Sequence, residues 1–123
     1  MAYSNSNRHA QAIPDYTRAI DLQPDFAAAY NNRGWACLEL GRLDEALRDL
    51  NKALELNPAH TTALFNRAHL YQKRLEYAAA IADFDSILQV NPSDTAAANQ
   101  KAAAQRQLRD NPSPSPSLIA PKS

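Results

Sequence analysis

The chain has 123 residues, enough for one domain, and its 13 Lys plus Arg residues balance 13 Asp plus Glu residues. This balance excludes a strong overall attraction to nucleic acids or membrane surfaces. The single cysteine, Cys37, cannot form an intrachain disulfide, which favours a reducing, cytoplasmic location. The first 30 residues contain no apolar run of the signal-peptide type, and no uncharged stretch in the folded part has the length and apolar character needed to span a bilayer.

The predicted elements are all helices, and the first of them is preceded by a short segment without a helical pattern. Residues 1–9 are expected to be disordered or frayed. A helix is predicted over about residues 11–22, with Pro14 in its first turn, where the missing N–H costs little. Pro24 follows, and a proline disfavours helix at the residue before it.

Two helix pairs follow. Residues 27–40 and 44–56 have helical apolar spacing and are separated by the turn Gly41-Arg42. Residues 61–74 and 78–90 repeat this plan. Asn57-Pro58 and Asn91-Pro92 end the second helix of each pair.

The C-terminal part is predicted as one helix and a tail. Residues 95–109 form the helix, with Ser93 or Asp94 as its N-cap and a polar outer side that is typical of a terminal cap. In residues 110–123 prolines alternate with serines, which predicts an extended, disordered tail. The alternative for this tail is a ligand for a Pro-recognising domain.

A fixed period runs through these elements. Pro24, Pro58 and Pro92 lie 34 residues apart, and small residues recur at the same spacing as Ala12, Ala46 and Ala80. Such a period is the mark of a stacked-repeat protein, an architecture that builds binding surfaces.

The slots of this period resemble the tetratricopeptide repeat (TPR) family. The unit 27–60 matches through Tyr30, Gly34, Gly41, Ala46, Ala53 and Pro58. The unit 61–94 matches through Leu64, Ala68, Tyr71, Tyr77, Ala80, Phe84 and Pro92, and departs at Leu75 and Ile87. The resemblance implies an all-α fold, a short right-handed superhelix of antiparallel helix pairs. It covers residues 10–109, as a partial repeat (10–26), two full repeats (27–60 and 61–94) and a capping helix (95–109).

Two arginine–aspartate pairs have the same spacing within the repeat. Arg33 and Asp49 are 16 residues apart, as are Arg67 and Asp83, which places the members of each pair near one level of an antiparallel helix pair. We interpret them as partly buried structural ion pairs. The alternative is that the arginines bind acidic groups of a ligand.

The resemblance also implies a concave groove lined by the first helix of each repeat. Carried over slot by slot, it predicts these groove residues: Asn31, Asn32, Trp35, Glu39, Thr62, Phe65, Asn66, His69, Lys73, Asn99 and Gln100. Trp35 is interpreted either as an anchor for a ligand or as a packing partner of Phe65. The family's two-carboxylate clamp needs cations and asparagines at five slots, and only Asn66 fits among Asn31, Trp35, Asn66, Ala96 and Gln100. We therefore expect a nearly neutral groove that suits an uncharged or mixed peptide.

No motif for catalysis, metal binding or a cofactor is present. His9, His60 and His69 lack metal-ligand spacing, and Cys37 occupies a packing slot, where a small buried hydrophobe is expected. The predicted function is a non-catalytic protein–protein interaction module that holds a peptide or helical segment of a partner, without nucleic acid or membrane partners. The alternative is a self-assembling piece that stacks through its N-terminal end, where Ile13, Tyr16 and Ile20 would lack cover.

Overall fold

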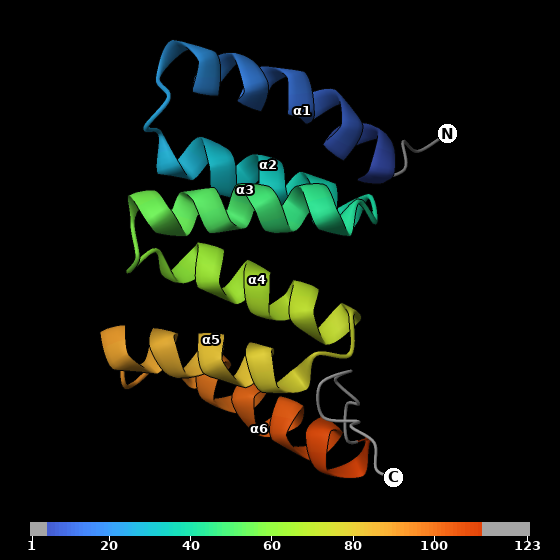
Figure 1. The fold of residues 1–123 in the computed structure, drawn as a ribbon, viewed down its shortest axis with the longest axis vertical. Coiled ribbons are helices and arrows are strands. Elements are labelled where there is room, and N and C mark those ends of the chain that lie inside the picture. Colours follow the sequence, from blue (N-terminus) through green and yellow to red (C-terminus); the bar gives the residue numbers. More distant parts are fainter. Residues whose placement is uncertain (1–4, 112–123) are drawn as a thin grey trace, which may run out of the picture.

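The computed structural model describes residues 5–111, and in this range the chain forms six α-helices that follow one another along the long axis (Figure 1). The helices are α1 (Asn5–Leu22), α2 (Ala27–Glu39), α3 (Leu43–Leu56), α4 (Thr61–Lys73), α5 (Tyr77–Val90) and α6 (Thr95–Asp110). The predicted all-α solenoid is confirmed. From α2 onward each predicted helix boundary is within one residue of the structure. None of the described helices has the length and apolar character that crossing a membrane requires.

The N-terminal prediction was wrong in its boundary. Helix α1 begins at Asn5, so residues 5–9 are helical and Pro14 lies inside the helix instead of in its first turn. A proline in a helix interior removes one backbone hydrogen bond and is costly. The additional N-terminal part of α1 makes a tertiary contact, because the His9 ring packs edge-on against the Trp35 ring of α2, with ring centroids 4.6 Å apart. Residues 1–4 and the predicted tail residues 112–123 lie outside the described part of the chain.

Helix α1 turns its apolar stripe toward α2. Ile20 is only 8% exposed, while Ile13 and Tyr16 are half-buried, so the expected lack of cover does not extend to Ile20. The opposite side carries exposed polar residues such as Asp15 and Arg18. Helix α1 therefore presents a polar outer surface at its end of the stack.

Small residues set how closely the helices approach. The alanines of the core that are fully buried include Ala46, Ala53, Ala63, Ala68, Ala80, Ala97 and Ala104. Gly34 marks a close approach of α2 and α3, because a Cβ placed there would lie 2.9 Å from Leu50 Cγ and 3.2 Å from the Ala46 carbonyl oxygen. Large residues such as Leu50 and Phe84 fill the space beside these contacts. Cys37 is 4% exposed, and burial raises the pKa of its thiol, as expected for a small buried hydrophobe.

The two turns inside the repeats use the same backbone conformation with different residues. Gly41 has a φ of 80°, in the left-handed region that suits glycine. Leu75 occupies the equivalent position with a φ of 63°, a strained conformation for a residue with a Cβ. The strain is local, since the Leu75 side chain is 59% exposed.

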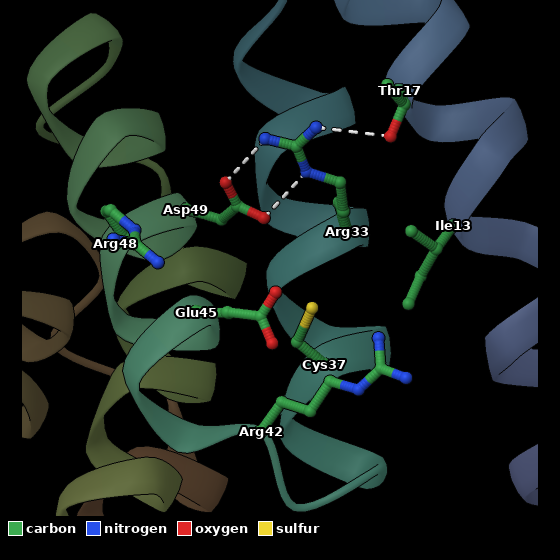
Figure 2. Close-up of a pocket in the computed structure, with 8 residues that line it drawn as sticks. All are labelled: Ile13, Thr17, Arg33, Cys37, Arg42, Glu45, Arg48 and Asp49. Atoms are coloured by element: carbon green, nitrogen blue, oxygen red, sulfur yellow. Dashed lines mark hydrogen bonds and ion pairs between the residues drawn. The ribbon is translucent and has the colours of Figure 1, made fainter.

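Each predicted arginine–aspartate pair ties three consecutive helices together. The Arg33 guanidinium donates two 2.8 Å hydrogen bonds to the Asp49 carboxylate on α3 and one of 3.2 Å to Thr17 Oγ1 on α1 (Figure 2). Arg67 repeats the pattern one period later. Its two bonds to Asp83 on α5 are 2.8 and 2.7 Å long, and it donates one of 2.8 Å to Asn51 on α3. The structural interpretation of both pairs is confirmed, and the hydrogen bonds to the carboxylates raise the pKa of each arginine.

The third arginine slot holds Lys101, and its partner comes from the other direction. Lys101 Nζ lies 2.6 Å from Asp85 Oδ1 on α5, the helix before it. Asp85 occupies the slot of Thr17 and Asn51. The first two arginines thus pair with an aspartate on the following helix, whereas Lys101 pairs with one on the preceding helix. We call these three sets of contacts the rungs.

Candidate functional site

The predicted groove lies on the layer formed by α2, α4 and α6. Two amide–amide hydrogen bonds connect neighbouring helices of this layer: Asn66 Nδ2 donates to Asn31 Oδ1 at 3.0 Å, and Gln72 Nε2 donates to Gln107 Oε1 at 3.1 Å. We call the solvent side of this layer the groove face. Arg33 and Trp35 are two residues apart, which is a turn of about 200° around the helix axis. Arg33 therefore points away from the groove face.

Trp35 is the large aromatic residue that the groove face leaves accessible. Its side chain is 40% exposed, and the ring contact that the structure shows for it is the one with His9 of α1. The Trp35 ring is therefore positioned by His9 and not by Phe65, which was the alternative interpretation. An indole fixed along one edge and open to solvent on the other presents apolar area together with a hydrogen-bond donor.

Phe65 belongs more to the core than to the groove surface. It is half-buried, and its ring lies 5.5 Å from that of Phe84 on α5 in an edge-to-face arrangement. Its other side meets the ring of His69 at 5.9 Å. Phe65 thus supports the groove from below and connects His69 to the core.

The two asparagines predicted for the groove differ in accessibility. Asn31 is 4% exposed and is occupied by its bond to Asn66, so it orients its neighbour instead of meeting a ligand. Asn66 is half-buried and uses one N–H for that bond. Its carbonyl oxygen and its second N–H are the remaining groups that can form hydrogen bonds, and they are held in a fixed orientation.

The end of the groove face near the C-termini of α4 and α6 is hollowed. His69, Gln72, Lys73 and Gln107 line a depression of about 280 Å³. Partial desolvation lowers the pKa of His69, and the charge of Lys73 lowers it further. The nearby carboxylate of Glu39 acts in the opposite direction. The imidazole therefore favours its neutral form, with one ring nitrogen available as a donor and one as an acceptor.

The remaining predicted residues lie along the margins. Asn32, Thr62 and Asn99 are exposed, and Gln100 is half-buried. Of the charged residues predicted for the groove, Glu39 and Lys73 are both exposed and offset each other. Among the described residues, no cluster of His, Cys, Asp or Glu has the arrangement needed to hold a metal ion.

Sequence reasoning missed Gln72 and Gln107. Their spacing is 35 residues, the same as that of Asn31 and Asn66, and both pairs bridge consecutive helices of the groove layer. A search for amides one period plus one residue apart would have found them.

Comparisons with known proteins place the chain among TPR proteins. A family model described as tetratricopeptide repeat matches residues 1–61. No curated protein matches the chain. Several solved structures are similar to the chain over most of its length, and three of them are described next.

The first TPR of Spaghetti (RPAP3), bound to the HSP90 peptide SRMEEVD, has 25% identity and a TM-score of 0.80, and the match covers 85% of this chain and 83% of that one. The Arabidopsis OM64 TPR domain has 27% identity and a TM-score of 0.76, with 83% and 84% covered. A TPR protein from Parabacteroides merdae has 31% identity and a TM-score of 0.77. There the match covers 86% of this chain but 41% of the other.

Proposed function

Because this chain belongs to the tetratricopeptide repeat family, we propose that it is a non-catalytic interaction module that binds a peptide or helical segment of a partner protein on its groove face. The observation that carries the proposal is an exposed aromatic ring on α2 together with an oriented amide on α4, the next helix of the groove layer. Trp35 is 40% exposed, and Asn66 is held by the 3.0 Å hydrogen bond that it donates to Asn31. A similar TPR domain has been solved with a peptide bound, which supports this class of partner.

The two residues suit different parts of a peptide. A partly exposed indole is the kind of residue that dominates binding energy at interfaces, since it buries a large area with little loss of side-chain freedom. A preoriented amide can bond both the N–H and the C=O of an extended main chain. We therefore assign an apolar or aromatic side chain of the partner to Trp35, and its backbone to Asn66.

The charge of the groove face narrows the peptide class. The charged residues predicted for this face, Glu39 and Lys73, are exposed and offset each other. The peptide held by the Spaghetti domain contains three acidic residues. Binding a strongly acidic segment without matching cations leaves desolvated charge unpaired. We therefore propose an uncharged or mixed segment as the ligand of this chain.

The test begins with peptides selected on the wild-type chain from a displayed library. Binding of one labelled peptide is then measured by fluorescence anisotropy for the wild type and for variants. Trp35→Ala should raise Kd by about 30-fold or more, the loss expected at an interface hot spot. Asn66→Ala should raise it by about 2- to 10-fold, as removal of one neutral hydrogen bond does.

The matched control is Gln89→Ala, because Gln89 is an exposed amide on α5, outside the groove layer. It should leave Kd unchanged. The peptide SRMEEVD serves as a competitor and should displace the selected peptide poorly. If both groove variants bind within about twofold of the wild type, the assignment of this face is wrong.

Self-association through α1 is the second function considered, and the outer side of α1 gives it little support. That side is polar, with Asp15 and Arg18 exposed. Sedimentation velocity over a concentration series measures it directly. A monomer throughout would remove this alternative and leave the groove proposal intact.

A further inference from the structure

A second hollow lies on the other side of α2, away from the groove face. It has a volume of about 290 Å³ and is enclosed by α1, α2 and the start of α3. Ile13 and Cys37 supply its apolar part, and the rung of Arg33 and Asp49 forms one wall (Figure 2). A neighbouring depression of about 570 Å³ shares Arg33, Arg48 and Asp49 with it. We call the two together the back furrow.

The smaller hollow of the back furrow coincides with a difference in side-chain volume between the first and the second repeat. Cys37 stands where the next repeat has Tyr71, whose ring lies 5.8 Å from the Arg67 guanidinium carbon. A thiol is much smaller than a phenol, so residue 37 places no ring beside Arg33, whose guanidinium carbon instead has the Tyr30 ring at 5.7 Å.

The rim of the furrow differs from its counterpart as well. Arg42, Glu45 and Arg48 line it and follow one another at intervals of three residues, so they share one side of the α3 region. The residues one period later are Glu76, Ala79 and Ala82, which give no cationic rim. The charged rim is thus a property of the first repeat alone.

The charges on this rim balance one another only in part. Arg33 is matched by Asp49 through two hydrogen bonds. Within residues 7–111, none of the ion pairs includes Arg42, Glu45 or Arg48. Two guanidinium groups and one carboxylate leave a net charge of about +1, which one additional carboxylate would balance.

We propose that the back furrow is a second interaction surface, which binds a partner segment carrying an apolar side chain and, two residues along, an acidic one. In an extended segment these two side chains point the same way. The apolar one enters the hollow against Ile13 and Cys37. The carboxylate meets Arg42 and Arg48, with which charge-assisted hydrogen bonds are strong.

The probe is the peptide acetyl-Ala-Leu-Ala-Glu-Ala-amide, titrated into the full chain and followed by two-dimensional amide NMR. Cross-peaks of residues lining the furrow should shift, and a matched peptide with Gln in place of Glu should bind at least about tenfold more weakly. The double variant Arg42→Gln/Arg48→Gln should lose the preference for the acidic peptide. Its control, Arg106→Gln/Arg109→Gln, removes the same charge from exposed positions on α6 and should retain it.

Two further variants test whether the charge of the rim and the volume of the hollow determine peptide binding. Glu45→Gln removes the competing carboxylate and should tighten binding of the acidic peptide. Cys37→Tyr restores the residue of the second repeat and should close the hollow, with the melting curve showing that the variant is folded. The inference is overturned if the Gln peptide binds equally well, if the arginine variant binds like the wild type, or if the shifts fall on groove residues such as Trp35.

Discussion

Removal of one carboxylate from a rung tests how strongly the rungs hold the repeats together. Asp83 is the sharper choice, because its side chain is 6% exposed and accepts two hydrogen bonds from Arg67. Asp83→Ala leaves the guanidinium without its counter-charge in a site that α5 covers. Breaking a fully buried pair in this way costs about 3–5 kcal/mol.

The expected cost of Asp83→Ala is lower than that of breaking a fully buried pair. The Arg67 side chain keeps 24% exposure, so water can reach part of the stranded charge, and its bond to Asn51 is retained. We therefore expect a loss of about 2–3 kcal/mol of unfolding free energy. For a domain of this size this corresponds to a fall in melting temperature of about 10–20 °C.

The assay is urea and thermal unfolding followed by circular dichroism at a helix wavelength. The comparison is Asp85→Ala, which breaks the more exposed third rung two residues along the same helix, where the carboxylate is 45% exposed and its partner Lys101 is 31% exposed. An exposed pair of this kind contributes at most about 1 kcal/mol. A cycle that adds Arg67→Met to Asp83→Ala should give a coupling of about 1–2 kcal/mol. If Asp83→Ala costs no more than Asp85→Ala, the buried rung of Arg67 does not carry the stability assigned to it.

Three further predictions concern single positions. Gly34→Ala should destabilise the fold by about 1–2 kcal/mol in urea unfolding, because overpacking against Leu50 and the Ala46 carbonyl outweighs the better helix propensity; a gain in stability would show that α2 and α3 can move apart. Leu75→Gly should stabilise by about 0.5–1 kcal/mol through relief of its left-handed backbone, with little packing lost from an exposed side chain, and a lower melting temperature would contradict this. The lowered pKa of His69 keeps the folded form neutral where the unfolded chain gains a proton, so stability should fall as pH drops below the ordinary value of 6.5; His69→Gln should flatten the measured slope between about pH 7 and 5, and an unchanged slope would refute this cause.

The period of the sequence was enough to predict most of the helices, because proline and glycine end a helix for local steric reasons. It failed at α1, where the helix continues through Pro14 and its N-terminal part packs on α2 with His9 against Trp35. No local pattern carries that information, since the two rings are brought together by the packing of α1 on α2. Asn31 shows a similar difference, because its slot implied a groove residue and its hydrogen bond to α4 buries it.

The candidate sites differ in how far a sequence could locate them. The rungs were predictable, since a charge pair at a constant spacing repeats in both units. The back furrow was not, because it arises from the absence of bulk at Cys37 together with charges on a different helix. A slot-by-slot comparison of residue volume between repeats is the observation that identifies such a hollow.

The rungs also bear on how the chain folds. Each of their contacts joins residues 16 positions apart, whether it runs backward to Thr17, Asn51 and Asp85 or forward to Asp49 and Asp83. Closing loops of this length costs little entropy, and topologies dominated by such local contacts fold fast. Three neighbouring helices joined by one arginine therefore form the smallest cooperative unit, and two such units overlap in α3. Helix α3 should consequently be the last to exchange its amide hydrogens with solvent, while the end helices open first.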